Sequence, residues 1–168
     1  IVVAAPALLA GQGNDPALEQ ARRFLATHRI VDGHNDLPWE IRVNPASLKD
    51  PAKYDLRGKV SGQTDIARLR TGGVGGQFWS VYLPFELEDS DYAKAQLEQI
   101  DIAKEVINRY PDVFALALSA NDVVRIMREG RIASLLGMEG GHAIENSLKL
   151  LRQYYDLGVR YMALTHNG

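Results

Sequence analysis

The strongest constraint on the fold is an alternation of two kinds of segment. Short runs that are apolar at nearly every position, such as 132–138, alternate with longer runs whose apolar residues recur every third or fourth position, such as 90–110. The first pattern is typical of strands buried on both faces, and the second is typical of amphipathic helices. The alternation therefore predicts parallel βα units whose sheet is covered by helices.

Individual elements can be placed from their patterns and from Pro and Gly residues. Strands are expected at 30–36, 74–83, 132–138 and 159–164, and helices from Pro16 onward, after Thr64, over 90–110, over 121–129 and around 148–155. Thr64 is the expected N-cap of its helix, which Gly72 and Gly73 are expected to end. The apolar run 114–118 fits either a strand or a helix segment.

The number of units indicates the size of the parent fold. Four βα units are about half of a (β/α)₈ barrel, which usually needs about 250 residues, and the chain has 168. We therefore expect an α/β chain that forms a partial TIM (β/α)₈-type barrel, with about the first four βα units. In domain terms, residues 14–168 are expected to be the N-terminal half of a truncated barrel domain.

The composition excludes several classes of function. The net charge is −2 at pH 7 and the Lys and Arg residues are scattered, so a nucleic-acid partner is not expected. The chain contains no cysteine, which removes thiolate zinc sites and cysteine nucleophiles. Any bound metal must therefore use His, Asp or Glu.

The N-terminus has two interpretations. Residues 1–13 contain a short apolar run followed by small polar residues, which matches the tail of a secretory signal peptide. The alternative is an ordinary disordered or strand-like terminus. The run is too short to span a bilayer. The expected location is accordingly either exported (periplasmic, secreted or membrane-attached) or cytoplasmic.

Three of the four expected strands end in side chains that bind metals. His34 and Asp36 end the first strand, and Glu139 and His166 follow the third and fourth. Residues two apart on a strand share a face, so His34 and Asp36 are expected to converge on one cation while Asn35 points away. The carboxyl ends of barrel strands meet at one rim, and oxygen ligands with imidazole nitrogen suit Zn²⁺ or a similar divalent ion.

The competing interpretation is that His-x-Asp, a short pattern of common residue types, occurs by chance and binds nothing. Neighbouring residues also have two interpretations each. Asp32 could orient a ligand or lie at the strand entry. His142 could orient Glu139 from behind, although a structural loop histidine is favoured. Trp39 and Tyr82 could line a pocket or pack into the core, and Tyr82 is kept as a substrate-contact candidate.

Four stretches of the chain resemble a known family, the renal or membrane dipeptidases, which are zinc peptidases of the amidohydrolase-like barrel superfamily. The stretches are VDGHNDLPW at 31–39, GVGGQFWSVY at 73–82, GMEGGH at 137–142 and LGVRYMALTHN at 157–167. They keep the family's order and correspond to its N-terminal half. The resemblance implies a metal-dependent hydrolase barrel.

The resemblance also implies the chemistry of the site. It implies two zinc ions, of which His34 and Asp36 bind one and Glu139 bridges both. The two histidines that hold the second ion in the family are absent from this chain. His166 resembles the histidine that polarises the scissile carbonyl, so Glu139 and His166 are the expected catalytic residues. A metal-bridged hydroxide would then hydrolyse a dipeptide, with Tyr82 and His166 contacting the substrate.

Two other functions remain open at this point. One is a barrel amidohydrolase that acts on another small amide or lactam, and the other is a noncatalytic half-barrel scaffold. The expected partners are a dipeptide and, in the intact protein, a second copy in a homodimer. The 168-residue chain alone is expected to be inactive, because ligands of one metal and the family's proton-handling acid are missing and a half barrel leaves strand edges unpaired.

Overall fold

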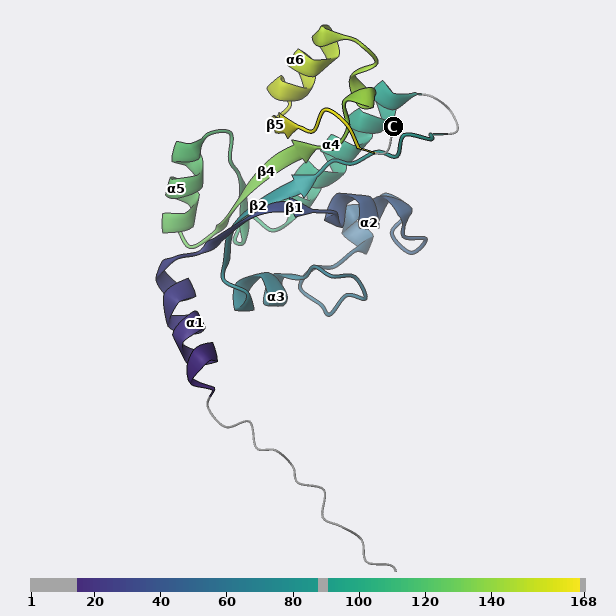
Figure 1. Cartoon of the computed structure of the whole chain (residues 1–168). Coiled ribbons are helices and arrows are strands. Elements are labelled where there is room, and N and C mark those ends of the chain that lie inside the picture. Colours follow the sequence, from purple (N-terminus) through teal and green to yellow (C-terminus); the bar gives the residue numbers. More distant parts are fainter. Residues whose placement is uncertain (1–14, 88–90, 167–168) are drawn as a thin grey trace, which may run out of the picture.

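The computed structural model describes residues 15–87 and 91–166 and consists of a parallel sheet with helices around it (Figure 1). The apolar run within residues 1–13, interpreted above as a signal-peptide remnant or an ordinary terminus, lies outside these residues. Within the described part, no helix combines the length and apolar character needed to cross a membrane.

The strands and helices follow the alternation seen in the sequence. The strands are β1 (Ile30–Asn35), β2 (Val74–Ser80), β3 (Phe114–Leu116), β4 (Ile132–Met138) and β5 (Val159–Met162). The helices are α1 (Pro16–Thr27), α2 (Leu37–Val43), α3 (Ile66–Thr71), α4 (Tyr92–Arg109), α5 (Ala120–Arg128) and α6 (Leu148–Asp156), with 3-10 turns η1 (Pro51–Lys53) and η2 (Gly141–Ile144). A strand is present in each of the four ranges expected from the sequence, although β2 ends at Ser80 and β5 at Met162, earlier than expected, and the ambiguous run 114–118 contains the short strand β3.

The sheet is parallel throughout and is centred on β4. Its order is β1-β2-β4, and both β3 and β5 pair with the other side of β4, β3 along the first half and β5 along the second. In the described part of the chain, β1 and β5 are each paired on one side only. This open parallel sheet agrees with the predicted partial (β/α)₈ barrel.

The main core lies between the sheet and α4, which runs behind the sheet in Figure 1. Every residue of β4 is buried, as its nearly continuous apolar sequence predicts. Most of the periodic apolar residues of α4, such as Ile100 and Ile107, are also buried. Leu97 is exposed, however, whereas Gln96 and Gln99 are buried. Gln96 tolerates burial because its Nε2 donates a hydrogen bond to the Val81 carbonyl oxygen at 2.9 Å.

One helix was not expected and one expected cap is wrong. Helix α2 follows β1 directly and has no strong sequence signal, because it is short and includes Pro38 in its first turn. Thr64 is not the N-cap of α3. Asp65 takes that position, and its carboxylate accepts a hydrogen bond from the Arg68 backbone N–H at 2.7 Å, while the Thr64 hydroxyl bonds to Asn35.

A glycine in β4 allows a long cross-sheet contact. Gly137 and Tyr161 are opposite each other in the β4–β5 pairing. A Cβ at Gly137 would lie 2.2 Å from the Tyr161 ring, so only glycine leaves room for that ring. The Tyr161 hydroxyl donates to the Gly33 carbonyl oxygen of β1 at 3.1 Å. A residue of the last strand thus braces the first.

We expect Gly137→Ala to destabilise the chain by about 1–3 kcal/mol, because the added methyl group displaces the Tyr161 ring. Urea denaturation measures the loss. Gly58→Ala is the control, since a Cβ there meets nothing closer than 3.6 Å. When combined with Tyr161→Leu, the alanine should cost less than it does alone. Strictly additive losses would contradict the steric explanation.

Tyr154 packs α6 against the core. Its side chain is fully buried and its hydroxyl donates to the Ala143 carbonyl oxygen at 3.1 Å. Burial, assisted by the nearby charge of Glu145, raises the pKa of Tyr154 to about 12. The folded state therefore favours the neutral phenol, and this contribution to stability is complete below the ordinary tyrosine pKa of about 10.

Stability should accordingly fall as the pH rises from about 10 to about 12. We expect Tyr154→Phe to flatten this fall by on the order of 2–3 kcal/mol, because the phenol that titrates is gone. Chemical denaturation at a series of pH values compares the two proteins. Parallel pH profiles for the wild type and the variant would argue against a buried, titrating phenol.

Candidate metal centre

The end of β1 places two donor side chains next to each other. His34 is the fifth residue of β1, and Asp36 follows the strand as the N-cap residue of α2. The His34 Nε2 and Asp36 Oδ1 atoms are 3.1 Å apart. Simple alternation along the strand does not produce this pair, because the β1–β2 register shifts between Asp32 and Asn35 and Asp36 has left the strand conformation.

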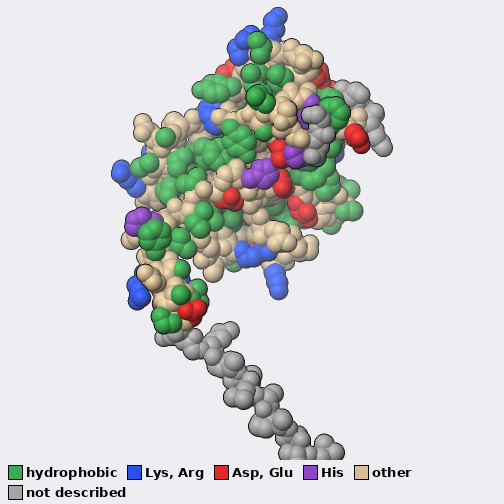
Figure 2. Space-filling model, viewed as in Figure 1, with side chains coloured by type: hydrophobic (Ala, Val, Ile, Leu, Met, Phe, Trp, Pro, Cys, Tyr) green, Lys and Arg blue, Asp and Glu red, His purple; other side chains and the backbone are tan. Residues whose placement is uncertain are grey.

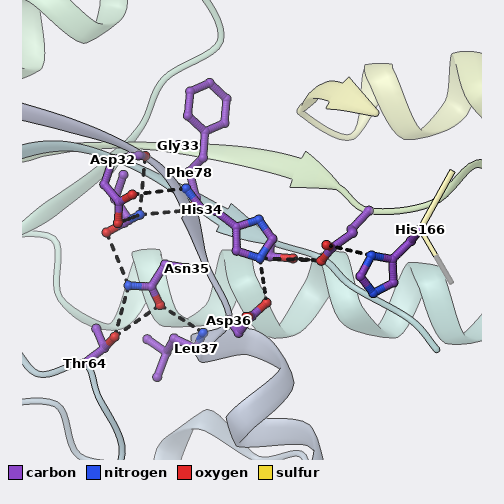
Figure 3. Close-up of polar contacts among 12 residues, drawn as sticks. Asp32, Gly33, His34, Asn35, Asp36, Leu37, Thr64, Phe78 and His166 are labelled. Atoms are coloured by element: carbon purple, nitrogen blue, oxygen red, sulfur yellow. Dashed lines mark hydrogen bonds and ion pairs between the residues drawn. The ribbon is translucent and has the colours of Figure 1, made fainter. Parts of the chain in front are cut away.

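The ends of β4 and β5 bring two further donors to the same place. Glu139 directly follows β4, and its Oε2 lies 3.5 Å from His34 Nε2. Its Oε1 lies 3.2 Å from Nδ1 of His166, which is four residues beyond β5. Figure 3 shows His34 and His166 directed toward the same region, with Asp36 beside His34. The structure therefore brings together the four side chains that the sequence analysis selected.

The donor set fits a divalent cation. One ligand atom from each of His34, Asp36 and Glu139 can be chosen so that all three lie within 4.8 Å of one another. Within the described part of the chain, the ion-pair partners of Asp36 and Glu139 are histidines and include no Lys or Arg. Two carboxylates facing each other without a fixed cation repel, and a bound metal ion would offset that repulsion.

The surroundings carry a negative potential. Burial and then the charges of Glu139 and Asp36 raise the pKa of the Tyr82 phenol. Tyr161 responds in the same way, since burial and the carboxylates of Glu139, Asp36 and Asp32 raise its pKa. Both tyrosines therefore remain neutral hydrogen-bond donors well above neutral pH. The potential that disfavours phenolate formation favours a cation.

The site is open to solvent. The side chains of His34 and Asp36 are 42% and 58% exposed, and Glu139 is deeper at 21%. Figure 2 shows the histidine and acidic side chains gathered beside an apolar area of the same face. His34 and Asp36 line a cavity of about 300 Å³ together with Trp39 and Tyr54. The space beside the donors is large enough for a small ligand.

Aromatic rings border the donors on one side. Tyr82 lies edge-on between His166, at 5.3 Å between ring centroids, and Trp39, at 5.1 Å. His142 instead packs edge-on against Tyr92, at 5.2 Å between ring centroids, and against Phe85, at 5.7 Å. This packing supports the structural interpretation of His142 and places Tyr82 beside the site.

Sequence reasoning missed several residues behind the donors. The Ser80 hydroxyl at the end of β2 donates to Glu139 Oε2 at 3.4 Å. Gln77, fully buried in β2, bonds to both Asp32 and Asn35. The one available signal was a buried-strand pattern interrupted by polar residues, since a polar side chain inside an apolar strand needs a partner.

Comparison with known proteins gives the family context. A model of the membrane dipeptidase family, peptidase family M19, matches residues 18–168. The chain is 45% identical over 161 residues to Dipeptidase ataJ of Aspergillus terreus, an alignment that covers 90% of this chain and 38% of that protein. It is 42% identical over 154 residues to Dipeptidase 3 of Mus musculus, covering 90% of this chain and 30% of the relative.

A solved structure agrees with these relatives. The crystal structure of dipeptidase AC, a metallo peptidase of family M19, aligns with a TM-score of 0.66 and 27% identity, over 82% of this chain and 42% of that chain. The chain thus spans less than half the length of the relatives that it matches. Because the family model extends over nearly all of the described residues, the chain belongs to the membrane dipeptidase family, peptidase family M19.

Proposed function

We propose that the protein in its family-length form is a zinc-dependent dipeptidase, and that residues 14–168 are the N-terminal half of its barrel domain. The convergence of His34, Asp36 and Glu139 within 4.8 Å carries the proposal. Membership in a metallopeptidase family and relatives named dipeptidases support it. Imidazole with carboxylate ligands, and no thiolate, suits a catalytic zinc site.

The residues of this chain have distinct roles in the proposed reaction. His34 and Asp36 would hold one ion, and the family resemblance implies that the carboxylate of Glu139 would be shared with a second ion. The second ion takes two histidines that this chain lacks. A divalent cation, when bound, makes a water nucleophile available near neutral pH and polarises a carbonyl.

His166 and Tyr82 act on the substrate side. His166 lies next to Oε1 of Glu139. From there a ring N–H can donate to the carbonyl oxygen of a peptide bond as negative charge develops on that oxygen. One well-placed donor of this kind is worth about 3 kcal/mol. The Tyr82 ring limits the rotation of His166 by edge-on packing and offers its neutral phenol to the substrate.

The proposal extends to partners and location. A dipeptide is the proposed substrate, and the intact protein is proposed to form a homodimer. An exported or membrane-attached location is also proposed, which the name of the membrane dipeptidase family supports. The 168-residue chain alone is proposed to be inactive, because it lacks the two further histidines that would hold the second ion. Besides His34 and His166 it contains only His28 and His142.

Metal binding can be tested on the chain itself. We expect the chain to bind Zn²⁺, and we expect Asp36→Asn to weaken its affinity for Zn²⁺ at least 10- to 100-fold. A loss of that size follows even when the residue removed is only hydrogen-bonded to a metal ligand. Isothermal titration calorimetry measures both proteins. Asp112→Asn is the matched control, because Asp112 pairs with Arg57 on the exposed surface. Equal affinities for the two variants would refute the site.

Activity can be tested in a chimaera that joins this chain to the remaining C-terminal part of Dipeptidase ataJ. We expect metal-dependent release of free amino acids from dipeptides, and no release by the 168-residue chain alone. His166→Leu should lower kcat by about 10²- to 10³-fold, because a donor to the developing oxyanion is lost. His28→Leu, at the end of α1, should leave kcat unchanged. A folded, metal-loaded but inactive chimaera would contradict the proposed function.

A further inference from the structure

The direction of the His34 side chain depends on an irregularity in β1. Asp32 pairs with Gln77 and Asn35 pairs with Trp79, so β1 advances three residues where β2 advances two. One extra residue in a strand is a β-bulge, which redirects the side chains that follow it. Without the bulge, His34 would share a face with Asp32 and Gln77.

The redirected face is the one that holds the other donors. Ser80 lies three residues beyond Gln77 in β2, so their side chains project from opposite faces of the sheet. The Ser80 hydroxyl donates to Glu139, and Glu139 in turn contacts His34. The bulge therefore moves the imidazole of His34 from the buried face of Gln77 to the face where Glu139 lies.

Gln77 clamps both ends of the bulge. Its Nε2 donates to Asp32 Oδ2 at 3.0 Å, and its Oε1 accepts from Asn35 Nδ2 at 3.3 Å. The Gln77 side chain is fully buried, so leaving its amide without hydrogen-bond partners is costly. One amide thus fixes the spacing between the two residues that flank Gly33 and His34.

The two residues that Gln77 holds, Asp32 and Asn35, also accept hydrogen bonds from the backbone near His34 and Asp36. Asp32 Oδ1 accepts from the His34 N–H at 3.3 Å, and Asn35 Oδ1 accepts from the Leu37 N–H at 3.0 Å. The Thr64 hydroxyl lies 3.0 Å from Asn35 Nδ2 and 3.2 Å from its Oδ1. Figure 3 shows Asp32, Asn35 and Thr64 connected on one side of the strand, with His34 and Asp36 on the other.

We propose that Gln77 is a positioning residue for the metal centre: it holds the β1 bulge that directs His34 toward Asp36 and Glu139. It touches neither the ion nor the substrate. This inference rests on the proposed function, because it requires these three side chains to bind a divalent cation.

The first test replaces the amide with an apolar side chain of similar length. We expect Gln77→Met to weaken Co²⁺ affinity 10- to 100-fold, measured by competition with a chelator and by a change in the visible absorption of the bound Co²⁺. Gln96→Met is the matched control, because Gln96 is equally buried and bonds to a carbonyl oxygen away from β1. It should leave Co²⁺ affinity within twofold of the wild type.

A second test exchanges donor and acceptor. Gln77→Glu places a second carboxylate against Asp32 and should weaken Co²⁺ affinity. Combining it with Asp32→Asn restores an N–H···O bond between the two positions and keeps the acceptors for His34 and Asn35. We expect the double variant to bind Co²⁺ more tightly than Gln77→Glu does. A general loss of packing would not be rescued in this way, so this comparison decides the matter if Gln77→Met does not fold.

A third readout needs no metal. Hydrogen exchange at the His34 amide, followed by NMR, should be faster in Gln77→Met than in Gln96→Met. If the wild type takes up no Co²⁺, the proposed function fails. If, in addition, the His34 amide exchanges no faster in Gln77→Met than in Gln96→Met, Gln77 does not hold the bulge either. If the wild type binds Co²⁺ and both methionine variants bind it equally well, the positioning role is wrong while the proposed function stands.

Discussion

The parallel pairing of β2 with β4 is the interaction on which the rest of the structure depends. It aligns Ser80 with Gly137 and so brings the carboxyl ends of the two strands to the same edge. Glu139 emerges from that edge beside the last residue of β2. Because β1 pairs with β2 and β5 pairs with β4, the residues that follow these strands are brought to the same edge of the sheet.

Near this edge, different contacts hold the end of β1 on the two faces of the sheet. On the buried face, the sheet packs against α4, and the buried amide of Gln77 bonds to Asp32 and Asn35. On the open face, Tyr161 crosses over Gly137 to reach the Gly33 carbonyl oxygen. The end of β1 is therefore held from both sides, although it lies at an edge of the described sheet. A rigid support of this kind keeps donor atoms in place where carboxylates repel each other.

The site concentrates negative charge where the fold supplies little to balance it. Two carboxylates approach one imidazole, and their charges add to the larger effect of burial in raising the pKa of Tyr82 and of Tyr161. The repulsion between these carboxylates is unfavourable, and a bound divalent cation would offset it. The arrangement is therefore more informative about function than any one of its residues, since His-x-Asp by itself is a common pattern.

The sequence by itself determined the order of strands and helices and the donor residues at the strand ends. Continuous apolar runs can only be buried strands or helices, and residue types at strand ends keep their place in any parallel βα arrangement. The tertiary structure alone decided the bulge in β1, the role of Thr64 and the partners of Gln77. These depend on the register between strands that are distant in the sequence, and hydrophobic periodicity carries no information about a one-residue shift of that register.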